Sequence, residues 1–128
     1  MRFLLDTHAF LWWTEDDDRL PARVQAIIQA SGNQIYLSAV CVWEVAIKTQ
    51  LGQLTLRRDP KETVRQEIEV NGLLPLAVDL QHALHVASLP LVHRDPFDRL
   101  LVAQAQLEGL TILTADQTIA RYDVPVVW

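Results

Sequence analysis

The chain has few cysteines, no long hydrophobic run and no excess of positive charge. Its 128 residues include one cysteine, Cys41, so no intrachain disulfide can form. No hydrophobic run approaches the length of a membrane-spanning helix, and Asp6 and His8 interrupt the apolar stretch at the start. The formal net charge is -5, which argues against a protein that holds nucleic acid through bulk positive charge. These absences favour a protein of the reducing cytoplasm that has no membrane segment.

The size and the residue pattern indicate one α/β domain over residues 1–128. Half of the residues are hydrophobic and 21% are charged, which suits a folded domain with a substantial core. Strands alternate with helices along the chain, and this order predicts a mainly parallel central sheet covered by helices on both faces, a three-layer α/β/α arrangement. We expect strands over 2–5, 34–37, 74–78, 110–113 and 125–127, and helices over 7–14, 20–30, 38–50, 60–70, 80–88, 96–108 and 115–121.

Four carboxylates stand in or beside apolar runs, where an ionised side chain is costly unless something compensates it. Each follows an expected strand or lies in an expected helix, and ligands of such folds bind outside the carboxyl ends of the strands. We therefore expect the four to converge and to require a cation, for which hard oxygen ligands favour Mg²⁺ or Mn²⁺. Such a centre points to metal-assisted chemistry on phosphate. The four are Asp6, Glu44, Asp98 and Asp116.

Two of these acids have simple structural alternatives. Asp6 could form an Asx turn or cap the helix that follows it. Glu44 could form an i,i+4 pair with Lys48, although the apolar helix around it leaves little room for a merely solvated glutamate.

The other two acids could serve helix N-termini. Asp98 falls in the first turn of a helix that Asp95 could cap, where an acid also suits the helix dipole. Asp116 could lie in the first turn of a short helix capped by Thr114. For His8 and His93, contact with phosphate is a minority expectation.

Taken together, four segments resemble the PIN domain, and specifically the VapC-type ribonuclease toxins of toxin–antitoxin pairs. They are LLDTHAFLWW, SAVCVWEVAIK, HRDPFDRLLVAQA and ILTADQTIARY, of which the third is the most specific. The acidic positions of the family fall on the four carboxylates above, and its supporting hydroxyl falls on Thr114.

The resemblance implies a function as well as a fold. It implies an endoribonuclease dependent on Mg²⁺ or Mn²⁺ that cleaves cellular RNA, usually transfer or ribosomal RNA, and so inhibits translation. A cognate VapB-type antitoxin would neutralise the enzyme, which would be a homodimer. Asp6, Asp98 and Asp116 would hold the metal and Glu44 would be a further ligand or a base. Thr7, Thr114 and Arg99 would support them.

The positive residues leave alternatives open. Lys48, Arg94 and Arg99 are candidates for contacting the RNA backbone, and Arg99 could equally pair with a neighbouring acid. The cluster Arg57–Arg58–Lys61–Arg65 is either a solvated helix face or a surface for RNA or an acidic antitoxin tail.

Other classes of protein also fit parts of the sequence. A haloacid-dehalogenase-type phosphatase begins similarly but needs a second acid where this chain has His8. A non-catalytic module of the same fold, binding RNA or protein, would make all four acids structural. A nuclease of this fold acting on DNA flaps is disfavoured by the small size.

Overall fold

Five parallel strands form one sheet in the computed structural model, which describes residues 1–128. The spatial order of the strands is β3-β2-β1-β4-β5, and every neighbouring pair is parallel. The mainly parallel α/β architecture expected from the sequence is confirmed. The strands are β1 (Arg2–Leu5), β2 (Gln34–Ser38), β3 (Leu74–Leu76), β4 (Thr111–Leu113) and β5 (Val126–Val127).

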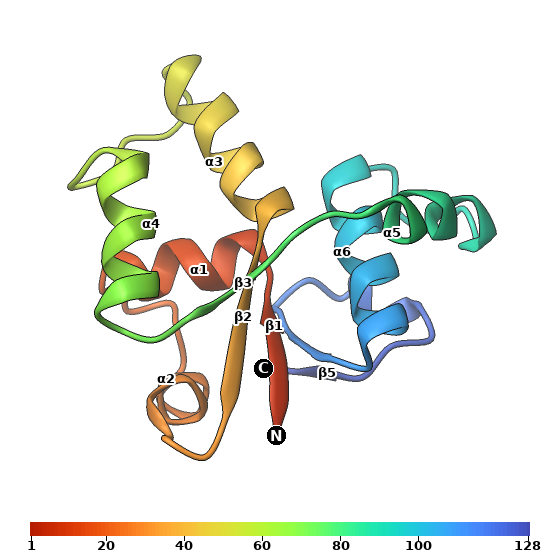
Figure 1. The fold of residues 1–128 in the computed structure, drawn as a ribbon, viewed down its shortest axis with the longest axis horizontal. Helices are drawn as coiled ribbons and strands as arrows, with labels where there is room; N and C mark the ends of the chain where they lie inside the picture. Colours follow the sequence, from red (N-terminus) through yellow and green to blue (C-terminus); the bar gives the residue numbers. More distant parts are fainter.

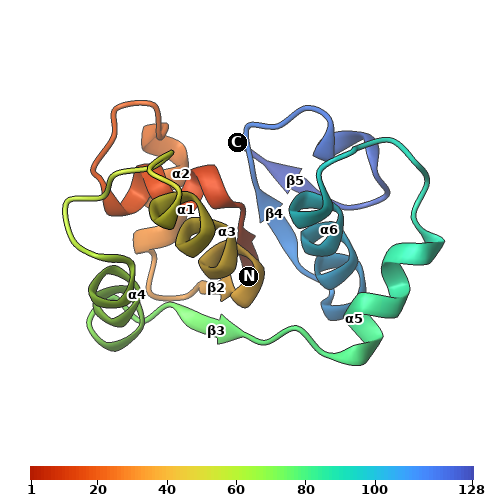
Figure 2. The same ribbon diagram turned by 90° about the horizontal axis from the view of Figure 1, so that it is seen from above.

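Helices cover both faces of the sheet. Figures 1 and 2 show α1 to α4 on one side and α5 and α6 on the other. This division follows from the right-handed crossover of parallel strands, because the chain first adds strands on one side of β1 and then on the other. The helices are α1 (Thr7–Thr14), α2 (Ala22–Gln29), α3 (Ala39–Gln50), α4 (Pro60–Glu69), α5 (Leu80–His85) and α6 (Pro96–Glu108), with 3₁₀ turns at Val86–Ser88 and Ile119–Arg121. No helix is both long enough and apolar enough to cross a membrane.

The first strand is the centre of the core. Phe3, Leu4 and Leu5 are all buried, and β1 pairs with β2 on one side and β4 on the other. A strand that is buried on both faces consists of consecutive apolar residues, and β1 has this pattern. The buried side of α6, including Leu101 and Val102, belongs to the same core. The end of β1 is therefore held rigidly from both sides.

Local signals fix the starts and ends of the helices that flank the candidate site. The hydroxyl of Ser38 accepts a hydrogen bond from the backbone N–H of Val40 and caps α3. Asp95 caps α6, whose first residue is Pro96. Gly109 ends α6 with φ of 67°, a left-handed conformation that glycine adopts without steric cost.

The last expected helix is the main difference from the sequence-based assignment. Residues 115–121 do not form a helix, and only the 3₁₀ turn at Ile119–Arg121 is regular. Side chains accept backbone N–H groups of this segment. The hydroxyl of Thr114 accepts from the N–H of Asp116, and the carboxylate of Asp116 accepts from the N–H of Thr118.

Smaller differences lie at element ends. The expected helix 20–30 begins at Ala22, the expected helix 80–88 becomes 3₁₀ after His85, and the expected strand 74–78 ends at Leu76. The 3₁₀ portion coincides with a hydrogen bond from the side chain of Arg99 to the carbonyl of Val86.

Candidate active site

The direction of strand addition reverses between β1 and β4, which lie side by side at the middle of the sheet. In open parallel sheets the crevice at such a reversal, outside the carboxyl ends of the strands, is where ligands bind. Asp6 follows β1 directly, and Thr114 follows β4 directly. The N–H of Asp6 donates to the carbonyl of Leu113, 3.2 Å away, so the two strand ends are joined.

Asp6 is almost completely buried at this point, with 3% of its surface exposed. One carboxylate oxygen accepts the N–H of Ala9 at 2.7 Å and caps α1, while the other accepts the hydroxyl of Thr114. Burial nevertheless raises the pKa of Asp6, against the opposing effect of these hydrogen bonds. Asp6 therefore does cap α1, as the structural explanation of this residue supposed. It uses one oxygen, and both oxygens keep lone pairs for a further contact.

Glu44 projects from α3 and is 4% exposed. The hydroxyl of Thr7 donates to Oε1 at 2.6 Å, and Nζ of Lys48 donates to Oε2 at 2.6 Å. The i,i+4 pair with Lys48 weighed as the alternative is thus present, but it is not a solvated surface pair. Since Thr7 follows Asp6, the end of β1 positions two acids at once.

Asp98 lies in the first turn of α6. The side chain of Asp95 accepts the N–H groups of Phe97 and Asp98 and so fixes this turn. Nε2 of His93 is 3.0 Å from a carboxylate oxygen of Asp98. Burial, followed by the charge of Asp95, raises the pKa of Asp98 to about 7, and the charges of Glu44 and Asp6 contribute to the rise.

Asp116 is the most exposed of the four acids. Its carboxylate accepts the N–H of Thr118 at 2.8 Å and lies 3.0 Å from Nε2 of His93. Partial burial acts to raise the pKa of Asp116, but the hydrogen bonds from His93 and Thr118 outweigh it and lower the pKa. The 3₁₀ turn replaces the expected helix, so Asp116 is held by a local turn and not by a helix dipole.

The structure brings all four carboxylates to one edge of the sheet. Asp6 is linked through Thr114 to Asp116, and Asp116 is linked through His93 to Asp98. Glu44 joins them electrostatically, because its charge contributes to the raised pKa of Asp98. The nearby positive charge consists of Lys48 and, when protonated, His93 and His8, of which His8 acts to lower the pKa of Asp6.

The donor atoms fit a hard divalent cation. Oxygens of Asp98 and Asp116 and a ring nitrogen of His93 lie within 4.8 Å of one another. Asp6 and Glu44 add buried carboxylates to the same region. Carboxylate oxygens with few thiolates or imidazoles are the set that Mg²⁺ and Mn²⁺ prefer. Burial is the largest cause of the raised pKa values of Asp6 and Asp98, and neighbouring acids add to both.

The expected supporting residues have distinct positions. Thr7 contacts Glu44, and Thr114 contacts Asp6, as described above. Arg99 does not pair with any acid. Its guanidinium donates to the carbonyls of Val86 and Pro90 and to the hydroxyl of Tyr122. Arg99 therefore braces the segment before α6, and its three partners leave it little freedom to reach RNA.

Sequence reasoning underestimated His93. It was a minor candidate for phosphate contact, yet the structure places its ring between two of the acids. The available signal was its position five residues before Asp98 in a turn that ends with a helix cap. His8, the other minor candidate, is exposed and lies beside the ring of Trp12.

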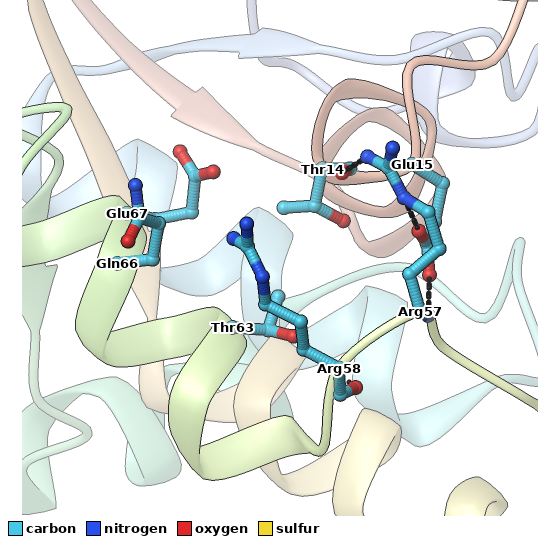
Figure 3. Close-up of a pocket in the computed structure, with 7 residues that line it drawn as sticks. All are labelled: Thr14, Glu15, Arg57, Arg58, Thr63, Gln66 and Glu67. Carbon is cyan, nitrogen blue, oxygen red and sulfur yellow. Dashed lines mark hydrogen bonds and ion pairs between the residues drawn. The ribbon is translucent and has the colours of Figure 1, made fainter.

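Two of the four residues in the cluster Arg57–Arg58–Lys61–Arg65 pair with neighbouring acids. Arg57 pairs with Glu15 at 2.7 Å, and Arg65 pairs with two glutamates of its own helix. Arg58 and Lys61 have no ion pair. Arg58 lines a polar cavity of about 150 Å³ between α1 and α4, and none of the four acids lines it. Figure 3 shows the side chains around this cavity. The cavity is lined by Thr14, Glu15, Arg57, Arg58, Thr63, Gln66 and Glu67.

The fold and this site define a class of α/β proteins. In this class an acidic pocket lies at the switch point of a parallel sheet, where the direction of strand addition reverses. The sequence model of the PIN domain matches residues 3–125. The chain belongs to the PIN domain family.

One curated relative is Ribonuclease VapC16 of Mycobacterium tuberculosis (strain ATCC 25618 / H37Rv). It is 38% identical over 61 residues, which are 48% of this chain and 43% of that protein. The chain thus matches less than half of the length of this relative.

Solved structures share the fold over the whole chain. VapBC2 from Rickettsia felis, bound to a DNA fragment from its promoter, has a TM-score of 0.74 at 14% identity, covering 100% of this chain and 99% of that one. FitAcB from Neisseria gonorrhoeae has a TM-score of 0.60 at 24% identity, covering 100% and 97%. VapBC-1 from nontypeable Haemophilus influenzae has a TM-score of 0.62 at 17% identity, covering 99% and 97%. At these identities the likeness shows the fold alone.

Proposed function

We propose that this chain is a VapC-type endoribonuclease toxin that depends on Mg²⁺ or Mn²⁺. The observation that carries the proposal is the meeting of four acids at the switch point with too little positive charge to balance them. The relative named as a ribonuclease supports the activity, and the VapBC neighbours support the fold on which it would operate. The substrate would be cellular RNA, with transfer or ribosomal RNA as the expected target, and the result would be inhibited translation in the cytoplasm.

Asp6, Asp98 and Asp116 would hold the metal ion, with Glu44 as a further ligand or as the group that orients water. A divalent ion bound here would supply Lewis-acid activation of the scissile phosphate and a lowered pKa for the attacking water. The Thr7 hydroxyl and Lys48 fix the Glu44 carboxylate in one orientation, as a group that positions or deprotonates water requires. In-line attack would leave a 5′-phosphate and a 3′-hydroxyl.

Purified protein incubated with transfer and ribosomal RNA tests the activity. We expect cleavage with Mn²⁺ or Mg²⁺, none with EDTA, and losses of at least about 100-fold in Asp6→Asn and Asp98→Asn, since removal of one charge-stabilising group costs roughly this much. Asp18→Asn, at an exposed acid away from the pocket, is the matched control. Near wild-type cleavage by either site variant would refute the mechanism. A metal-stabilised protein that binds RNA without cutting it would be the non-catalytic module instead.

We further propose a cognate VapB-type antitoxin and a homodimeric toxin. The structural neighbours include VapBC and FitAB structures, which supports a protein partner of this kind. Expression of the chain alone should arrest growth, and co-expression with the product of an adjacent short reading frame should restore it. Light scattering of the purified chain would measure the oligomeric state. Growth arrest that Asp98→Asn does not relieve would argue against a nuclease toxin.

A further inference from the structure

We propose that Tyr122 is a positioning residue of the acidic pocket, which acts through His93 on Asp98 and Asp116. The effect that we expect on cleavage rests on the proposed function. The effect that we expect on metal binding does not require that RNA be the substrate.

The hydroxyl of Tyr122 joins three segments of the chain. Tyr122 is 4% exposed and follows the 3₁₀ turn that comes after Asp116. Its oxygen accepts the backbone N–H of His93 at 2.7 Å and Nη1 of Arg99 at 3.1 Å. The segment after β4, the segment before α6, and α6 itself therefore meet at one buried oxygen.

The side chain of His93 is fixed as firmly as its backbone. Nδ1 accepts the backbone N–H of Asp95 at 3.1 Å, so the hydrogen of the neutral ring is on Nε2. Nε2 lies 3.0 Å from a carboxylate oxygen of Asp98 and 3.0 Å from one of Asp116. One imidazole thus sets the separation of two acids that come from different elements.

Arg99 completes the support from the other side. It lies one residue after Asp98 and donates to the carbonyl of Pro90 at 2.8 Å as well as to Tyr122. The segment that carries His93 is therefore held by a hydroxyl near its middle and by a guanidinium at its start. Loss of the Tyr122 hydroxyl would leave the N–H of His93 without its partner and free this segment to shift.

The ring and the hydroxyl of Tyr122 can be separated experimentally. Tyr122→Phe keeps the buried ring and removes only the oxygen. Tyr36→Phe is the matched control, because it makes the same chemical change on β2, where the hydroxyl contacts only Arg2 at 3.5 Å. Both variants should unfold within a few degrees of the wild type in EDTA.

Three measurements should separate the two variants. For Tyr122→Phe we expect Mn²⁺ binding, followed by calorimetry, to weaken by about tenfold, as is usual when support for a metal ligand is removed. The kcat for RNA should fall by about tenfold while KM stays within about twofold, because the RNA surface is unchanged. The imidazole ¹⁵N–¹H signals of His93 should move in the metal-free protein. Tyr36→Phe should change none of these.

A double-mutant cycle with His93→Ala tests whether Tyr122 acts through His93. In the His93→Ala background, Tyr122→Phe should have no further effect on Mn²⁺ binding beyond about twofold, because coupled residues are not additive. A full tenfold loss in that background, or Mn²⁺ binding by Tyr122→Phe equal to wild type, would overturn the proposal. If the wild type binds Mn²⁺ but cleaves no RNA, the nuclease function fails while the binding cycle still decides the role of Tyr122. Absence of Mn²⁺ binding by the wild type would overturn both.

Discussion

Neutralising Asp98 should stabilise the metal-free protein, even though the variant would lose its function. The pKa of Asp98 is raised from 3.8 to about 7, chiefly by burial and then by the charge of Asp95. Proton linkage converts this difference into a penalty of about 4 kcal/mol for the ionised group in the folded state. Asparagine removes that penalty. It also gives up a favourable interaction with the N-terminus of α6 worth up to about 1 kcal/mol. We expect a net gain of about 3 kcal/mol in the free energy of unfolding for Asp98→Asn at pH 8 in EDTA.

The pH dependence has a definite sign. The folded-state pKa of Asp98 lies above the unfolded-state value, so the folded wild type binds more protons than the unfolded chain. The free energy of unfolding of the wild type therefore falls as pH rises from about 4 to about 7. Above about pH 7 the ionisation of Asp98 causes no further change in it. The advantage of Asp98→Asn should be small near pH 4, grow up to about pH 7 and then stay constant.

Urea unfolding in EDTA at several pH values measures this difference directly, with Asp18→Asn as the control for a change of net charge. A gain of about 3 kcal/mol corresponds to a rise in Tm of roughly 11 °C for a domain of this size. Added Mn²⁺ should stabilise the wild type strongly and the variant little. An Asp98→Asn protein that is no more stable than wild type at pH 8 in EDTA would show that burial and neighbouring charge do not penalise the ionised Asp98 as argued.

Other substitutions test individual contacts. Thr7→Val should lower the free energy of unfolding by about 1–2 kcal/mol and reduce RNA cleavage, because Oε1 of Glu44 loses its donor; urea unfolding and a cleavage assay would show this. Gln104→Leu should cost about 2 kcal/mol in urea unfolding, because Gln104 is fully buried and the Ser38 hydroxyl donates to it. Cys41 should react with a thiol reagent only after unfolding, because it is buried and burial raises the pKa of its thiol; rapid labelling of the native protein would contradict this.

Features set by neighbours in sequence were predictable. The cap at Asp95, the helix over 96–108 and the buried strand β1 all follow from short-range patterns, and the structure has them where they were expected. The convergence of the four acids could also be anticipated, because parallel strands present their carboxyl ends at one edge. Sequence order was enough for that inference, although no distance could be predicted.

Features set by distant partners were not predictable. The Thr7 contact with Glu44 joins residues 37 positions apart, and the Arg57 pair with Glu15 spans 42. Periodicity carries no information about such pairs. The helix expected at residues 115–121 failed for a different reason. Thr114 followed by Asp116 suggested a capped helix there, but the side chains of these two residues accept backbone N–H groups in a turn instead.

The acidic pocket draws on residues from the start, the middle and nearly the end of the chain. No fragment that ends before Asp116 can assemble it, and β1 cannot be flanked on both sides until β4 has been made. During synthesis on the ribosome, the nascent chain therefore has no complete pocket until the segment that follows β4 has emerged. A chain with this strand order cannot assemble the pocket while only its first three strands have been made.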